Sequence, residues 1–337
     1  MSPGSTSLLS TGAGPWDPAI KIAPAECGFG VVSLYFDPRT PVRVRPIIQA
    51  DAAVLVKAAA GHLADLGVIG PRRVDLFFLA RSRIRVGVRG FCETDDEDVR
   101  AFRIELSGAS AAAGLPLLRL LLAHELGHVV SGCIDAQLGQ ARPYGGVGTV
   151  AALLVDEYLA ERTMGDLLRP HLVASETNPV PAELLSQIGA RNVEIYARPL
   201  RRWYRPLPAR IRAAYRDEPG PRSLVPTMLE IKRLASPIAY ATGSAHAFGV
   251  SPAPLSAALA ALPHDVAAVL EHLAGDLDAA GAKLGHQPSL PELAAFRAQV
   301  DPTVEEAIGR LSRLLLARVA GRTPPAEMHP GWLIQAS

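Results

Sequence analysis

The chain has 337 residues, which is enough for one large domain or two of ordinary size. Its 34 basic and 33 acidic side chains leave a net charge of +1, which argues against a protein dedicated to nucleic acid or to a membrane surface. The three cysteines are odd in number and widely spaced, so we expect no disulfide framework and a reducing, cytoplasmic location. Abundant alanine and the excess of arginine over lysine are typical of a GC-rich bacterial coding sequence.

Both ends of the chain are expected to be tails. Residues 1–18 are rich in Ser, Gly, Thr and Pro and have little to bury, so we expect a flexible segment without a secretory signal. Residues 323–337 contain Pro and Trp and are expected to lie on the surface. No apolar run is long enough to predict a membrane span, and we expect a soluble protein.

Strands and one helix are predicted in the first third of the chain. The apolar run Cys27–Phe36 predicts a strand that ends at an Asp-Pro pair. An apolar stripe at helical spacing predicts a helix over Ile47–Leu66. Three further strands are expected at Arg73–Leu79, Ile84–Cys92 and Ala101–Leu106.

The segment Leu117–Gly132 carries the strongest chemical signal, a His-Glu-x-x-His pattern within a run of apolar helix formers. Residues four apart lie one above the other on a helix, so His124 and His128 can point their imidazoles at one metal ion. Glu125 lies about 100° further round the helix, where it can reach a water. Such an arrangement suits a metal-assisted hydrolase, and the alternative is a core helix with hydrogen-bonded histidines. We expect the helix to end at Gly132.

A second helical pattern, Val150–Met164, offers candidates for a third ligand, because Asp156, Glu157 and Glu161 interrupt its apolar run. Glu157 and Glu161 share a face, so one can bind the ion while the other buttresses it. Asp156 is a rival ligand, about 100° away from Glu157 around the helix. The glycine-rich stretch 141–148 before this helix is expected to be a flexible connection, in which Tyr144 is a further candidate electrophile.

These motifs resemble those of the gluzincin zinc metallopeptidases, in which a second helix donates a glutamate to the ion. Within that group the chain is most similar to the ImmA/IrrE-type metallopeptidase domain, through His-Glu-Leu-Gly-His and the later Glu-x-x-Ala-Glu. The likeness covers about Asp75 to Pro170, and Glu161 stands where larger gluzincins usually have Asp. It implies the Zn²⁺ ligands His124, His128 and Glu157, the general base Glu125 and the supporting acid Glu161.

The resemblance also implies a fold. We expect an α+β protein with a zincin-like core at 19–175, composed of a small mixed sheet, the HExxH helix and the glutamate-donor helix. A mainly helical region is expected to follow at 176–322, after a Pro-rich boundary at 178–181. In zincin cores an edge strand beside the metal pairs with an extended substrate, and Phe102–Ser107 is the candidate here.

The helical region contains two further candidate features. The run Arg191–Arg216 mixes arginine with Trp and Tyr and is a candidate surface for an acidic or nucleic-acid partner, the alternative being a solvated helical face. Small residues at Tyr240–Gly249 predict a loop, from which His246 or Tyr240 is a candidate oxyanion donor. Four helices are expected beyond it, at 255–262, 264–280, 289–299 and 302–320.

The sequence therefore favours a zinc-dependent hydrolase, most specifically a peptidase that acts on a peptide or protein substrate. Two alternatives remain open. The metal fold could serve as a regulatory or binding module with weak or no turnover. The same chemistry could also hydrolyse a non-peptide amide or ester in a biosynthetic pathway.

Overall fold

The structure is a computed structural model that describes residues 20–22, 29–79, 90–94, 98–107, 115–139, 146–173, 182–217, 224–285 and 288–320. The two predicted tails, the boundary at 178–181 and Tyr144 lie outside these residues. The contacts divide the chain into two compact units, Met1–Gly61 with Gly70–Glu125 and His62–Ile69 with Leu126–Ser337. Two of the three divisions fall inside continuous helices, α1 (Arg45–Asp65) and α3 (Leu115–Leu138), so each helix contributes to both units; the third, between Ile69 and Gly70, precedes β3.

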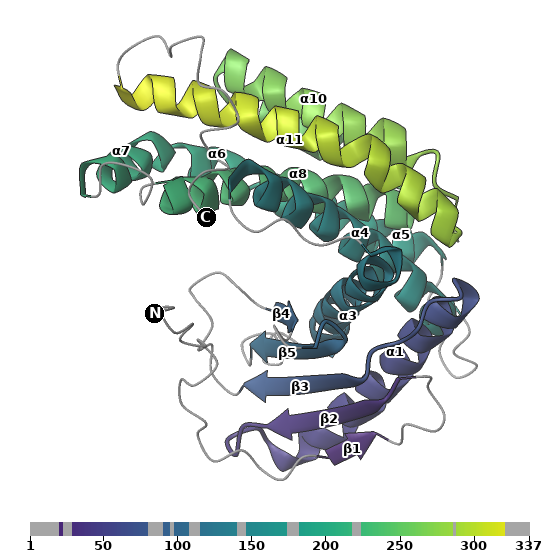
Figure 1. The fold of residues 1–337 in the computed structure, drawn as a ribbon. Helices are drawn as coiled ribbons and strands as arrows, with labels where there is room; N and C mark the ends of the chain where they lie inside the picture. Colours follow the sequence, from purple (N-terminus) through teal and green to yellow (C-terminus); the bar gives the residue numbers. More distant parts are fainter. Residues whose placement is uncertain are drawn as a thin grey trace, which may run out of the picture. The chain divides into compact units, whose positions relative to one another are not determined.

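The first unit is built on a five-stranded mixed sheet with the strand order β1-β2-β3-β5-β4 (Figure 1). Its strands are β1 (Ile20–Ile22), β2 (Val31–Phe36), β3 (Arg73–Leu79), β4 (Gly90–Thr94) and β5 (Ala101–Ser107). The central strands β2, β3 and β5 run parallel, and β1 and β4 pair antiparallel with their neighbours. Leu34, Leu76 and Ile104 lie in register across the parallel strands and are completely buried, so they form the centre of this core.

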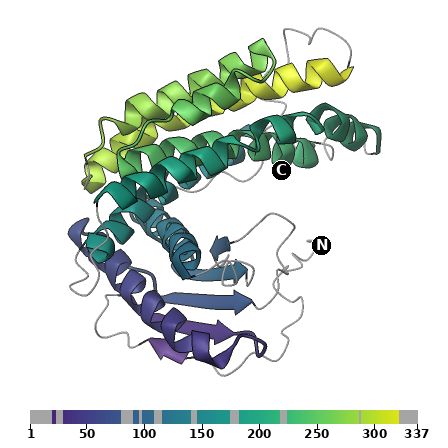
Figure 2. The ribbon, with the colours of Figure 1, turned by 180° about the vertical axis from the view of Figure 1, so that it is seen from behind.

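Helix α1 covers one face of this sheet in both views (Figures 1 and 2). Its buried side chains include Ile48, Leu55 and Leu63. The segment Val42–Asp65, which includes the short 3-10 turn Val42–Val44, is long and apolar enough to cross a membrane by length and composition, a test that core helices of soluble proteins also pass. The expectation of a soluble protein without a membrane span stays a prediction.

The prediction that Phe102–Ser107 forms an edge strand is wrong. Strand β5 lies between β3 and β4, because β4 pairs with it antiparallel from Gly90 opposite Leu106 to Thr94 opposite Phe102. Within the described sheet the edges are β1 and β4.

The second unit is helical. Besides the end of α3, it contains α4 (Gly146–Val173), α5 (Ala182–Ala197), α6 (Leu200–Tyr204), α7 (Leu207–Asp217), α8 (Leu224–Phe248), α9 (Ala253–Leu259), α10 (His264–Gly281) and α11 (Leu290–Ala320). Helix α4 packs against α8 and α11, and α8 also packs against α5 and α10. The predicted α+β class, with a small mixed sheet and a mainly helical C-terminal part, is confirmed. The predicted domain limits, 19–175 and 176–322, stay predictions.

Three predicted interruptions lie inside continuous helices, because small or cyclic residues do not interrupt a helix that packs well. Helix α3 continues through Gly132 and ends at Leu138. The next residue, Gly139, has a φ of 65°, the left-handed conformation typical of the residue after a helix. The expected loop Tyr240–Gly249 belongs almost entirely to α8. Helix α11 runs through Pro302, where two helices were expected.

Candidate metal centre

Two helices bring the candidate ligands together. His124 and His128 lie one turn apart on α3, and Glu157 lies on α4; one ligand atom from each falls within 4.8 Å of the others. Among the described residues these three form the cluster with the composition of a metal site. Two imidazoles and a carboxylate are therefore placed so that they could hold one metal ion.

A close approach of the two helices at Gly127 sets this geometry. A Cβ built on Gly127 would lie 2.6 Å from the carbonyl oxygen of Ala160 and 2.8 Å from its Cα. Only glycine allows this approach, because the atoms in the way belong to the backbone of α4. The glycine of His-Glu-Leu-Gly-His thus lets the turn that carries His128 reach the turn that carries Glu157.

His128 lies between two carboxylates of α4. Its Nδ1 is 2.9 Å from Oδ2 of Asp156, and its Nε2 is 3.2 Å from Oε2 of Glu157. Burial acts to lower the pKa of His128, but the two carboxylates together outweigh burial and raise this pKa to about 10. Two carboxylates around one imidazole favour its protonated form in the absence of metal, and a metal ion held at Nε2 would take the place of the proton that faces Glu157.

The rival acids on α4 consequently have different surroundings. Asp156 accepts the Nδ1–H of His128, which fixes the ring and leaves Nε2 to face Glu157. The expected role of Glu161 as a supporting acid stays a prediction. Glu161 is completely buried and accepts a hydrogen bond of 2.6 Å from the hydroxyl of Tyr196 on α5.

Glu125 is buried, with 4 % of its surface exposed, and lies beside His124 in the same turn of α3. A carboxylate in this position has little access to bulk water, which suits a group that takes a proton from one bound water.

The structure places the two candidate oxyanion donors in other contacts. His246 receives the Tyr158 hydroxyl at Nδ1 (2.6 Å) and meets Asp278 through Nε2 (2.9 Å), which joins α4, α8 and α10. Tyr240 stacks on Tyr196, with ring centroids 5.0 Å apart. Both residues therefore have described packing roles within the helical unit.

The sequence analysis did not identify Lys232 as a residue of this site. This residue of α8 places its Nζ 3.4 Å from Oε1 of Glu157, so the carboxylate lies between an imidazole and an ammonium group. Helix α8 follows α4 much later in the chain, and no local pattern connects the two positions. The one available signal was the rarity of lysine, which occurs at only four positions in the chain.

The arginine-rich run is distributed over α5, α6 and α7. Arg191 and Arg198 both pair with Glu194, and Arg210 pairs with Glu230. These exposed pairs are what the alternative of a solvated helical face predicts. A partner for this surface stays a prediction.

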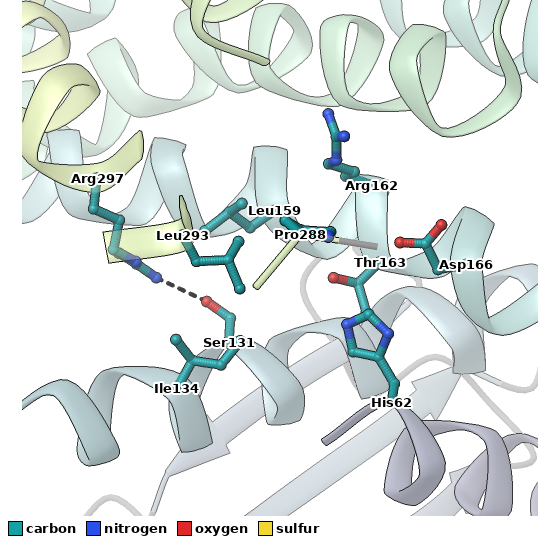
Figure 3. A pocket seen from close by; sticks show the side chains of 10 residues that line it. All are labelled: His62, Ser131, Ile134, Leu159, Arg162, Thr163, Asp166, Pro288, Leu293 and Arg297. Carbon is teal, nitrogen blue, oxygen red and sulfur yellow. Dashed lines mark hydrogen bonds between the residues drawn. The ribbon is translucent and has the colours of Figure 1, made fainter. Parts of the chain in front are cut away.

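A small cavity within the second unit is lined by residues of α3, α4 and α11 (Figure 3). On one side Arg297 of α11 donates to Ser131 (2.9 Å) and pairs with Asp135 (2.8 Å), both on α3. On the other side His62 points toward Thr163 and Asp166 (Figure 3). The cavity volume of about 20 Å³ is enough for a single water molecule. The polar residues around it therefore have a structural role rather than one in substrate binding.

Comparison with protein-family models, with characterised proteins and with solved structures finds no match to this chain. The candidate function therefore depends on the geometry of the cluster and on the motifs in the sequence.

Proposed function

We propose that the protein is a zinc-dependent hydrolase, most specifically a peptidase, with His124, His128 and Glu157 as the metal ligands. The observation that carries this proposal is the convergence of these three ligand atoms within 4.8 Å beside a buried glutamate. The donor set fits zinc, which is bound in hydrolases by two histidines and one glutamate. The 3.2 Å between His128 Nε2 and Glu157 Oε2 also fits, because two ligands of a tetrahedral zinc ion are separated by about 3.3 Å.

Bound zinc supplies a Lewis acid that polarises the scissile carbonyl group and lowers the pKa of a water to about 7. The protein's own groups carry out the proton transfers. The Glu125 carboxylate takes a proton from the attacking water and delivers it to the leaving amine. Asp156 holds Nδ1–H of His128, so this imidazole keeps the tautomer in which Nε2 is a ligand.

The test separates metal binding from catalysis. The full-length protein is loaded with zinc, its metal content is measured, and it is incubated with a peptide library whose cleavage is followed by mass spectrometry. We expect Glu125→Gln to retain about one zinc per chain and to lose cleavage by about 10²-fold or more. A matched control is Glu271→Gln, an exposed position on α10.

Two results would contradict the proposal. Wild-type protein without bound metal would assign the histidines a structural role. Full cleavage activity in the Glu125→Gln protein would rule out this residue as the general base.

A further inference from the structure

The second oxygen of Glu157 has a partner that the metal site alone does not explain. Oε2 faces His128, whereas Oε1 faces Nζ of Lys232 at 3.4 Å. One carboxylate thus connects a proposed metal ligand with an ammonium group. Lys232 belongs to α8, which packs along α4, and its neighbours Ile231 and Leu234 are buried. The stem of Lys232 therefore starts from a fixed point in the helical unit.

Lys232 keeps donor capacity beyond this ion pair. An ammonium group has three N–H donors and accepts no hydrogen bond. Within the part of the chain that the structure describes, Lys232 has one ion pair, to Glu157. Its side chain is 27 % exposed, so a dissolved ligand can reach part of it.

The charge of Lys232 favours an anion at this position. A cation beside a carboxylate that also binds a divalent ion adds positive charge to the site, and this charge opposes metal binding. The same charge would be favourable beside a negatively charged oxygen of a ligand bound at this site. The cluster thus combines a metal-ligand set with a side-chain cation at its rim.

The two other candidate donors of α8 also have described contacts. His246 bridges Tyr158 and Asp278, and Tyr240 stacks on Tyr196. Lys232 of α8 contacts a proposed metal ligand, Glu157.

We propose that Lys232 is the anion-binding residue of this site and donates hydrogen bonds to a negatively charged oxygen of the substrate or of the tetrahedral intermediate. This inference rests on the proposed metal-dependent function. It assigns Lys232 the task for which His246 and Tyr240 were candidates.

The experiment uses full-length protein loaded with Co²⁺ in place of zinc and titrated with inorganic phosphate. Changes in the visible cobalt spectrum report the dissociation constant of phosphate, so no substrate needs to be known. We expect Lys232→Met to bind cobalt with the wild-type stoichiometry and to bind phosphate about 10-fold more weakly or worse, as expected for a lost hydrogen bond to a charged group. Lys232→Arg keeps the charge and should recover part of the affinity.

The matched control is Lys283→Met, which removes the same charge at an exposed position after α10; its phosphate affinity should equal that of the wild type. Equal phosphate affinity in Lys232→Met and wild type overturns the proposal. Loss of cobalt from Lys232→Met also overturns it, because Lys232 would then only position Glu157. A wild-type protein that binds no cobalt contradicts the proposed metal function as well, whereas the two preceding outcomes leave that function intact.

Discussion

At the scale of single residues, the two nitrogens of His128 distinguish the adjacent acids Asp156 and Glu157. The sequence predicted that three acids on one helix compete for the ion, and it could not say which oxygen meets which nitrogen. That choice depends on how α3 crosses α4, because residues 100° apart on a helix reach different sides of the same ring. The structure places Asp156 on Nδ1 and Glu157 on Nε2.

Asp156→Asn tests this division of roles. The amide oxygen can still accept Nδ1–H, but without the negative charge that strengthens the bond and makes the imidazole a better ligand. We expect zinc affinity to fall about 10–100-fold, with about one zinc still bound at saturation. A competition titration with a chromophoric chelator measures both quantities.

Asp278→Asn is the control, since Asp278 meets His246 at the same 2.9 Å without belonging to the metal cluster. Its zinc affinity should be unchanged. If Asp156→Asn bound zinc as tightly as the wild type, Asp156 would have no part in holding His128.

At the scale of helices, small residues determine where α4 can pack. A Cβ on Gly243 of α8 would lie 2.6 Å from the Tyr158 carbonyl oxygen, and one on Gly165 of α4 would lie 2.6 Å from the Cβ of Ala247. The stretch around His246 therefore has small residues because α8 lies close to α4. In the sequence, the same composition indicated a loop.

This error shows which information a local pattern contains. Strand β3 was predicted at its observed bounds, Arg73–Leu79, because a short run rich in apolar and aromatic residues is a local property of the sequence. The continuation of α3 through Gly132 and of α11 through Pro302 depends on packing partners far away in the chain. Sequence patterns predicted the ligand set His124, His128 and Glu157, whereas the contact of Lys232 with Glu157 required the arrangement of α8 on α4.

Gly127→Ala tests the close approach of α3 and α4. The added methyl group meets the backbone of Ala160, so the two helices must separate. We expect the free energy of unfolding of the metal-free protein to fall by about 1–3 kcal/mol, as for other overpacked cores. Zinc affinity should also fall, because His128 and Glu157 move apart. Urea unfolding and the chelator titration measure the two effects.

The same substitution at Gly275 provides the control, because this exposed glycine of α10 has no atom within 4 Å of an added Cβ. Gly275→Ala should raise the free energy of unfolding by about 0.5–1 kcal/mol through helix propensity and leave zinc binding unchanged. Unchanged stability and zinc affinity in Gly127→Ala would show that the helices do not meet at this point.

At the scale of the molecule, buried arginines join the helices of the second unit. Arg162 of α4 donates to the carbonyl oxygens of Gly281, Leu284 and Gly285, which lie at and beyond the C-terminus of α10. Carbonyl groups at a helix end lack partners within the helix and carry partial negative charge, so a guanidinium group satisfies both requirements. Arg297 of α11 similarly pairs with Asp135 of α3. The α10–α11 pair is thereby tied to the two helices that carry the proposed ligands.

Asp166 is a carboxyl group of this unit whose burial should limit stability at neutral pH. Burial raises its pKa from 3.8 to about 6, more than the nearby Arg162 and Arg169 lower it. The folded protein therefore holds this proton more tightly than the unfolded chain does. Below pH 3.8, the pKa of this group in the unfolded chain, the neutral side chain makes its full contribution to the free energy of unfolding. That contribution is lost as the pH rises through about 6, the pKa in the folded state. Above that pH the ionised side chain lowers the free energy of unfolding by about 3 kcal/mol at most.

Asp166→Asn removes the ionisation and keeps the shape of the side chain. We expect this variant to be about 1–3 kcal/mol more stable than the wild type at pH 7.5, with the difference shrinking as the pH falls toward 4, where the wild-type carboxyl is also neutral. Urea unfolding of both proteins across this range gives the difference at each pH, and Glu271→Gln, at an exposed site on α10, should show no comparable trend. A variant that is equally stable relative to wild type at every pH would mean that Asp166 titrates alike in the folded and unfolded chains. In that case water would reach the side of α4 that faces the cavity. The hydrogen bonds from Arg162 to the end of α10 would then form in contact with water rather than in a dry interior.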